Sequence, residues 1–299
     1  FRCYFYPNKT TVHMKTVLLL AFAGVFVHSL RAQPDFEKAD AFARSFKNSY
    51  KDAADLALQL TKPFETEAEK ARVIFTWVAE NIRYDYAKFK NPPPKPVYRG
   101  RTRQEIEEEK KEWLEEDLQY TLRKKKGVCA DYSQLVQRMC ETAGLESVIV
   151  SGESRRLRGR SGSHAWNAIK IDGQWRLVDA TWGSGYIDDE SDRFVSRFSP
   201  GFFDTPPDLF ALDHFPTEEK WQLLEKPVLK TDFRKQPMVN YGNPAFALRS
   251  FAPSDGKLRM INGQTEVRLK FGQAPPPALL VVAGLKRVLT AEVKTTDDG

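Results

Sequence analysis

Residues 164–179 read HAWNAIKIDGQWRLVD and decide the fold predicted for the centre of this chain. Two runs rich in aliphatic and aromatic residues, 164–171 and 174–179, flank the dipeptide Asp172-Gly173. An Asp-Gly dipeptide is typical of a tight hairpin turn, because both residues tolerate the positive φ angles that such a turn requires. The stretch therefore predicts two antiparallel strands joined by a hairpin.

The segments just before this hairpin predict a third strand and a helix. Residues 147–152 (SVIVSG) are apolar and partly β-branched, which favours a strand. Residues 127–144 place Leu135, Val136, Met139 and Cys140 on one side of a helix that ends at Gly144. One helix feeding a meandering antiparallel sheet predicts an α+β fold.

The residues before this helix predict further helices and one surface excursion. Residues 35–60 are rich in Ala, Phe, Leu and charged groups, and they predict one or two helices. Thr66 and Glu69 have the spacing of a capping box at the start of another helix. Residues 88–118 combine a proline-rich break with a heavily charged run at 105–116. We expect a mobile surface excursion that carries a solvated helix.

The N-terminal end is set apart from the central domain, which we place at residues 35–230. Residues 1–13 precede Met14 and are interpreted as an upstream leader that lies outside the fold. Residues 14–32 combine a lysine, a short apolar run and the small residue Ala32, which is the pattern of a signal peptide. We therefore expect an exported protein: periplasmic, secreted or associated with the cell envelope.

The C-terminal end, residues 231–299, predicts a small β-rich appendage. Weak alternation between Pro and Gly breaks indicates strands at Lys257–Ile261, Glu266–Phe271 and Leu279–Leu285. The sequence leaves open whether this appendage is a complete domain. We expect it to be a surface for a partner at the cell envelope.

The charge balance is basic, with a formal net charge of +6 and a pI of about 9.0. The basic side chains form small knots at residues 123–126 and 155–160. Neither knot belongs to a nucleic-acid-binding motif, so we predict no nucleic-acid partner. We interpret both knots as solvated loops, with contact to an acidic substrate as the alternative.

Cys129 is the candidate nucleophile. A thiol attacks a carbonyl only as a thiolate, so it needs surroundings that favour the anion. The unpaired N–H groups at a helix start supply part of this, and Cys129 lies where the 127–144 helix begins. A neighbouring imidazole supplies the rest by taking the thiol proton and later giving it to the leaving group.

His164 and Asp179 are the candidate base and its orienting acid. His164 lies eight residues before Asp172, and Asp179 lies six after Gly173. Antiparallel pairing around that turn brings both to the same end of the sheet. With side chains alternating at period two, both also face the same way, so Asp179 can hold the imidazole by a hydrogen bond.

Three motifs in this region resemble those of the transglutaminase-like superfamily. They are GVCADY at 127–132, SHAWN at 163–167 and VDATWG at 178–183. The segments 70–85 and 202–224, the second of which contains His214-Phe215-Pro216, are similar to the branch that contains the kyphoscoliosis peptidase. The resemblance covers roughly residues 60–230. It leaves the excursion at 88–118 and the basic loop at 154–162 unmatched.

The resemblance implies a papain-like core, in which the helix carrying the cysteine packs on an antiparallel sheet. It also implies a catalytic triad of Cys129, His164 and Asp179. Such a triad would act on protein or peptide amides through a thioester, as a peptidase or amidase rather than as a crosslinking transglutaminase. The alternative is a catalytically silent binding or scaffold module at the cell envelope.

The other chemically notable residues are given structural interpretations. Cys140 lies about three helical turns after Cys129 and is expected in the core. His214 is interpreted as structural. The tryptophans Trp166, Trp175 and Trp182 are expected to pack around the site, with Trp182 a candidate to line its cleft. No CxxC or HExxH spacing and no glycine-rich phosphate loop occurs, so no metal and no cofactor are predicted.

Overall fold

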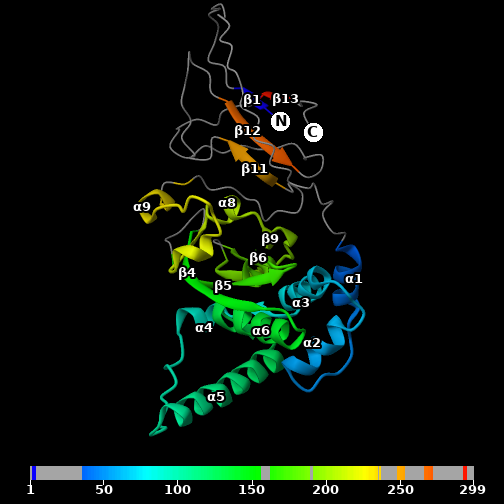
Figure 1. Ribbon diagram of the computed structural model, residues 1–299, viewed down its shortest axis with the longest axis vertical. Helices are drawn as coiled ribbons and strands as arrows, with labels where there is room; N and C mark the ends of the chain where they lie inside the picture. Colours follow the sequence, from blue (N-terminus) through cyan, green and yellow to red (C-terminus); the bar gives the residue numbers. More distant parts are fainter. Residues whose placement is uncertain are drawn as a thin grey trace, which may run out of the picture.

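The computed structural model describes residues 36–155, 162–188, 191–234 and 236, and the backbone of four short strands nearer the chain ends. Those strands are Arg2–Tyr4 (β1), Leu248–Ala252 (β11), Glu266–Phe271 (β12) and Glu292–Lys294 (β13). Helices and a five-stranded antiparallel sheet form the core (Figure 1). The α+β class is confirmed.

The central sheet is built around the predicted hairpin. β5 (Gly162–Ile171) pairs antiparallel with β6 (Gln174–Val178), and Asp172 (φ 50°) and Gly173 (φ 77°) make the turn. The other strands of this sheet are β4 (Ser147–Ser154), β9 (Phe203–Thr205) and β10 (His214–Pro216). The order across the sheet is β10-β4-β5-β6-β9. The three strands predicted from sequence are therefore its three central strands.

Helices cover one face of this sheet. α6 (Cys129–Thr142) and α3 (Glu67–Asn81) lie against it, and α1 (Glu37–Ser45) and α2 (Ala53–Thr61) pack beside them (Figure 1). The predicted capping box starts α3: Thr66 Oγ1 accepts from Glu69 N at 3.2 Å, and a Glu69 carboxylate oxygen accepts from Thr66 N at 3.4 Å.

Alternate residues of β5 serve two apolar clusters. Ile169 and Ile171 belong to the large cluster formed with the helices. Trp166 and Ala168 belong to a smaller cluster on the other face, together with Phe210 of α8 (Pro207–Phe210). Period-two alternation explains this division. It also places His164 on the Trp166 face of β5.

The predicted excursion is correct in part. The charged run is helical, but α5 (Arg103–Lys124) continues past residue 118 and buries Leu118 and Leu122. The start of the excursion is not a free surface segment. Lys88, in α4 (Tyr86–Lys90), forms an ion pair at 2.8 Å with Asp131 of α6 and thereby ties the excursion to the core.

The interpretation of the two basic knots as solvated loops is correct only in part: Arg123, Lys124 and Lys126 are exposed, whereas Lys125 and Arg155 are partly buried. The Lys125 ammonium lies 4.2 Å from the Trp77 ring centroid, and burial lowers its pKa to about 8. The Arg155 guanidinium donates to the carbonyls of Leu212 (3.2 Å) and Gln236 (3.1 Å). Both cations therefore make contacts that stabilise the fold. Residues 156–160 of the second knot lie outside the described residues.

The chain ends contribute a second sheet, ordered β11-β12-β1-β13. β12 coincides with the strand predicted at Glu266–Phe271, whereas the strands predicted at 257–261 and 279–285 lie outside the described residues. Residues 1–13 were set aside from the fold, yet Arg2–Tyr4 pairs with both β12 and β13. The signal peptide predicted at 14–32 also lies outside the described residues. Within the described part of the chain, every helix is too short or too polar to cross a membrane.

The remaining elements are short and connect these layers. They are β2 (Arg83–Tyr84), β3 (Lys126–Gly127), α7 (Ala180–Ser184), β7 (Gly185–Asp188), β8 (Arg193–Ser196), two 3₁₀ turns at Pro200–Phe202 and Glu219–Gln222, and α9 (Lys230–Phe233).

Candidate active site

Cys129 is the first residue of α6, as predicted, and its side chain is partly exposed. The Asp131 carboxylate folds back and accepts a hydrogen bond from Val128 N at 2.7 Å, which fixes the helix start. Gly127 leaves room for this, because a Cβ there would lie 2.7 Å from the Asp131 Cβ. The N–H groups of the first turn of α6 have no acceptor within the helix, so they stabilise an anion at Cys129.

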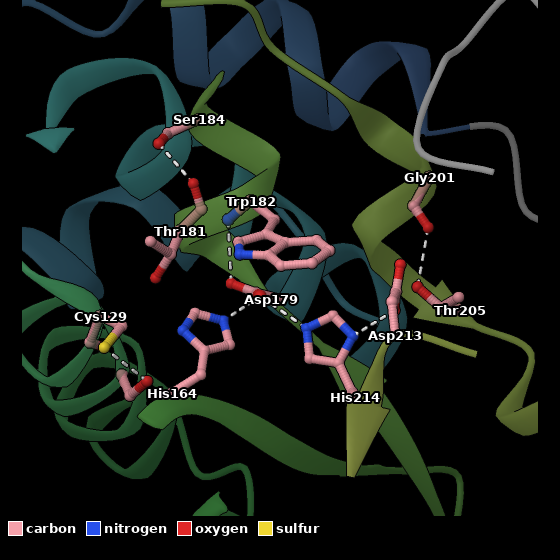
Figure 2. A network of polar contacts seen from close by, with 11 residues as sticks. Cys129, His164, Asp179, Thr181, Trp182, Ser184, Gly201, Thr205, Asp213 and His214 are labelled. Atoms are coloured by element: carbon pink, nitrogen blue, oxygen red, sulfur yellow. Dashed lines mark hydrogen bonds and ion pairs between the residues drawn. The ribbon is translucent and has the colours of Figure 1, made fainter. Parts of the chain in front are cut away.

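His164 lies in β5, directly opposite Gly152 of β4. Its Nε2 lies 2.7 Å from Asp179 Oδ2, and the side chain is only 6% exposed. Its second ring nitrogen, Nδ1, lies on the Cys129 side of the ring (Figure 2). Burial disfavours the charged ring, but the Asp179 carboxylate outweighs it, with a smaller contribution from the neighbouring Cys129, and the pKa of His164 is raised to about 10. The ring is therefore held as a cation at neutral pH.

Asp179 follows β6 and caps α7. Its Oδ1 accepts from Trp182 N at 3.0 Å, and the side chain is fully buried. Val178 of β6 pairs with Asn167 of β5, so the next residue, Asp179, lies opposite Trp166, which is two residues from His164 on the same strand. Burial alone would raise the pKa of this carboxyl, but the charge and hydrogen bonds of His164 and the hydrogen bond of His214 hold it well below its usual range. The predicted convergence of His164 and Asp179 is confirmed.

His214 joins the same carboxylate, which the sequence did not predict. It lies in β10, opposite Ser154 of β4, so the two strands on either side of β4 carry the two histidines. Its Nε2 lies 3.1 Å from Asp179 Oδ2, and its Nδ1 lies 2.6 Å from Asp213 Oδ1 (Figure 2). The sequence gave two hints: His214 lies in the 202–224 segment that carries the family resemblance, and an aspartate precedes it.

The tryptophans divide between the site and the scaffold. The ring centroid of Trp182 lies 5.7 Å from that of His164 and 4.6 Å from that of His214, and its side chain is partly exposed. Trp166 is buried behind both imidazoles. Trp175, in contrast to the prediction, packs on Trp221 in the smaller apolar cluster. It lies four residues before Asp179 on β6, at the other end of the strand.

The second cysteine is inert in this fold. Cys140 is fully buried in the core, as predicted, and burial raises the pKa of its thiol far above the usual range. A buried, protonated thiol is neither a nucleophile nor a metal ligand.

Three side chains of the site could in principle hold a metal ion. His164, Asp179 and His214 offer ligand atoms that lie within 4.8 Å of one another, a set that suits zinc or iron. These atoms already pair with one another, however, because Asp179 Oδ2 is hydrogen-bonded to Nε2 of both His164 and His214. A ring nitrogen that donates a proton has no lone pair for a metal. Hydrogen bonding accounts for the arrangement, and the expected lack of a cofactor stays a prediction.

Comparison with known proteins identifies the family. Residues 54–180, which include Cys129, His164 and Asp179, match the family model described as the transglutaminase-like superfamily. The chain belongs to this superfamily. A helix that begins at a cysteine and packs on an antiparallel sheet is the core that the sequence resemblance implied.

The curated relatives of this transglutaminase-like chain point to one branch. It is 30% identical to kyphoscoliosis peptidase from Homo sapiens over 247 residues, which is 79% of this chain and 34% of that protein. It is 30% identical to the Mus musculus protein of the same name over 83% of this chain and 36% of the relative. Hillarin from Drosophila melanogaster is 26% identical over 69% of this chain and 25% of its own length. The chain therefore falls in the branch containing kyphoscoliosis peptidase, and it spans about a third of the length of the first two relatives.

Solved structures add only a loose likeness. A crystal structure of a TGase is 18% identical and covers 60% of this chain and 40% of its own, with a TM-score of 0.32. A superposition at that score carries no argument about this transglutaminase-like domain.

Proposed function

We propose that the chain is an exported, cysteine-dependent acyl-transfer enzyme that acts on protein or peptide amides through a thioester. The observation that carries the proposal is the buried pair of His164 and Asp179, 2.7 Å apart, with the other nitrogen of the imidazole on the side of Cys129 (Figure 2). This is the nucleophile, base and orienting acid that covalent catalysis by cysteine requires. Family membership supports a cysteine-dependent enzyme in general.

The hydrogen bond between His164 and Asp179 assigns the roles of the two ring nitrogens. Asp179 Oδ2 is an ionised carboxylate oxygen, so it only accepts, and Nε2 must carry a hydrogen. Nδ1 is then the nitrogen that exchanges a proton with Cys129. In the resting enzyme Nδ1 holds the thiol proton, which makes a thiolate–imidazolium pair.

The reaction follows from this pair. The Cys129 sulfur attacks the carbonyl carbon of an amide, and the C–N bond breaks as Nδ1 of His164 gives its proton to the leaving amine. A thioester and a neutral imidazole remain. Water then attacks the thioester while Nδ1 takes its proton, and the C–S bond breaks to release a carboxylic acid and restore the thiolate. The backbone N–H of Cys129 is our candidate for one oxyanion donor, since it lies in the first turn of α6.

The choice between hydrolysis and crosslinking concerns only the second half-reaction. An amine that replaces water would give a new amide and make the enzyme a transglutaminase. We propose a peptidase or amidase, because the curated relatives with 30% identity are named peptidases. The export proposal rests on the signal-peptide pattern at residues 14–32. We further propose that residues 231–299 contact a partner at the cell envelope.

Two measurements test this function. Wild type and Cys129→Ala should be treated with a thiol-directed electrophile at neutral pH, and the modified residue should be located by mass spectrometry. We expect the peptide that contains Cys129 to be modified in wild type and the peptide that contains buried Cys140 to stay unmodified in both proteins, with any label on Cys3 the same in both. Equal labelling of both proteins would remove the case for an activated Cys129.

The second measurement separates the reaction outcomes. A peptide library should be incubated with wild type and Cys129→Ala, with and without an added primary amine, and read by mass spectrometry. We expect cleaved peptides that depend on Cys129 in both conditions. Amine-bearing products in place of cleavage would assign a transglutaminase, and an unchanged library would favour the silent module.

A further inference from the structure

His214 lies between two carboxylates in the most enclosed part of the site. Its Nδ1 lies 2.6 Å from Asp213 Oδ1 and its Nε2 lies 3.1 Å from Asp179 Oδ2. The ring is 1% exposed, and the Asp213 side chain is 6% exposed. Both ring nitrogens therefore face an oxygen acceptor with little access to water.

This geometry constrains the protonation of the ring. A neutral imidazole carries one N–H group and one lone pair, so one of its nitrogens would point a lone pair at a carboxylate oxygen. A doubly protonated ring donates to both acids and avoids this repulsion. Burial opposes the charged ring, but Asp213 and Asp179 outweigh it and raise the pKa of His214.

The surroundings of the ring also suit a cation. Phe210 stacks on it with the ring centroids 3.8 Å apart and 16° between the planes, and the Trp182 ring centroid lies at 4.6 Å. Aromatic faces attract a cation when it is removed from water. Two other cations among the described residues lie close by: His164, whose ring centroid lies at 5.5 Å, and Arg155, which donates to the carbonyl of Leu212 beside Asp213.

We propose that His214 is a positioning residue of this site: an imidazolium clamped between Asp213 and Asp179 that holds the Asp179 carboxylate in line with His164. The inference rests on the proposed function of Cys129, His164 and Asp179. It extends the triad into a chain of alternating acids and bases that runs from Asp213 through His214, Asp179 and His164 to Cys129.

The clamp has two effects on His164. His214 and Trp182 N bind different oxygens of Asp179, so the carboxylate cannot rotate away from His164. The positive ring also competes with His164 for the same oxygen, Oδ2, and so limits how firmly Asp179 holds the proton on His164. A cation at this position favours the thiolate and disfavours an over-stabilised His164 imidazolium.

The protonation is tested directly by NMR of the full chain labelled with ¹⁵N-histidine. The chain has four histidines, and the signals of His214 are assigned by their loss in His214→Gln. We expect both ring nitrogens of His214 to carry protons at neutral pH and above, beyond the ordinary histidine pKa of about 6.5. One unprotonated nitrogen on His214 at neutral pH would overturn the proposal. This readout needs no catalysis, so it stands even if Cys129 proves inert.

The effect on the site is tested by the pH profile of Cys129 alkylation in wild type, His214→Gln and the control Phe210→Leu. Without the positive ring of His214, the protons on His164 and Cys129 are held more tightly. The alkylation profile of His214→Gln should therefore shift to higher pH by about one unit. Phe210→Leu removes packing against the same ring without removing charge. It should lower the melting temperature and leave the profile in place. A folded His214→Gln protein with the wild-type profile would contradict the proposal, as would an equal shift in both variants.

A second variant covers a failure of His214→Gln to fold. The double substitution Asp213→Asn, His214→Gln removes one charge of each sign and allows amides to replace both hydrogen bonds. We expect it to fold and to shift the alkylation profile in the same direction by a smaller amount. A folded double variant with an unshifted profile would assign His214 to packing alone.

Discussion

Asp131 and Asp179 lie at the starts of neighbouring helices, and each is paired with a cation from another part of the chain. Asp131, the third residue of α6, accepts from the N–H of Val128, which precedes the helix, and binds the Lys88 ammonium at 2.8 Å. Asp179 precedes α7, accepts from Trp182 N in its first turn and binds His164 at 2.7 Å. The two carboxylates thus fix the starts of two helices at the candidate site by hydrogen bonds of opposite direction along the chain.

The two pairs differ in the cation. Burial opposes the charge on Lys88, but Asp131 outweighs it and raises the pKa of Lys88, so this ammonium cannot exchange protons near neutral pH. An imidazole can take part in proton transfer, because its ordinary pKa lies near 6.5 and because the second nitrogen of His164 lies on the side of Cys129 (Figure 2). A helix-capping carboxylate therefore makes a structural anchor with lysine and an acid–base centre with histidine. Matched substitutions in the two pairs should separate stability from catalysis.

The largest effect is expected for Asp179→Asn. The amide keeps the shape but loses the charge that holds Nε2 of His164 protonated, so the ring can adopt the wrong tautomer. We expect kcat/KM on a cleaved peptide to fall by roughly 10³–10⁴-fold. Steady-state kinetics with the best peptide from the library measures this. A loss below tenfold in a folded variant would place Asp179 outside the catalytic chain.

Asp131→Asn is the matched substitution in the other pair. It removes the nearer of the two carboxylates paired with the half-buried Lys88, leaving Asp117 at 3.8 Å, and it weakens the acceptor of Val128 N, so the free energy of unfolding should fall by roughly 1–3 kcal/mol. The kcat of the folded variant should stay close to wild type. Denaturant unfolding and steady-state kinetics on the same sample measure the free energy of unfolding and kcat. Loss of kcat without loss of stability would reverse the distinction between the two carboxylates.

The pH dependence of kcat should follow the ionisation of His164 and should not depend on the pair of Lys88 and Asp131. The pKa of His164 is raised to about 10, so below that pH its imidazolium can protonate the leaving amine, and above it the proton is lost. Each pH unit above this value should therefore lower kcat about tenfold where acylation limits the rate. Asp131→Asn should keep the same alkaline limb. An alkaline limb at a different pH in Asp131→Asn than in wild type would show that the two pairs are coupled.

The smallest effect is expected at Gly127. An added Cβ would lie 2.7 Å from the Asp131 Cβ, so the carboxylate of Asp131 would have to move away from Val128 N. Gly127→Ala should cost about 1 kcal/mol of stability through this overpacking. The same substitution combined with Asp131→Asn should cost less than the sum of the two, which a double-mutant cycle measures. Full additivity would mean that Gly127 acts independently of Asp131.

Local patterns predicted much of this fold. The Asp172-Gly173 turn, the alternation along β5 and the capping box of Thr66 and Glu69 each depend on neighbours in sequence, and all were confirmed. The pairing of His164 with Asp179 followed because a hairpin fixes its own register. These are the parts of the site that lie within one supersecondary unit.

The contacts that were missed join distant segments. His214 reaches Asp179 because β10 pairs with β4, and a short strand of three residues gives no sequence signal of its partner. Lys125 and Arg155 looked like members of solvated knots, since a run of basic residues does not reveal which side chain lies over Trp77 or beside the carbonyl of Leu212. The excursion was misjudged for the same reason, because Lys88 and Asp131 lie 43 residues apart.

The central claim is that a helix start and a carboxylate-held imidazole activate Cys129, and its most direct test is the alkylation rate of Cys129 below neutral pH. Wild type and His164→Gln should be compared at about pH 6 with the modified cysteine located by mass spectrometry, a pH at which an unassisted thiol of pKa near 8.5 is almost fully protonated. The imidazole should hold the thiol proton, so we expect wild type to react at least about tenfold faster. Equal rates in two folded proteins would contradict the account.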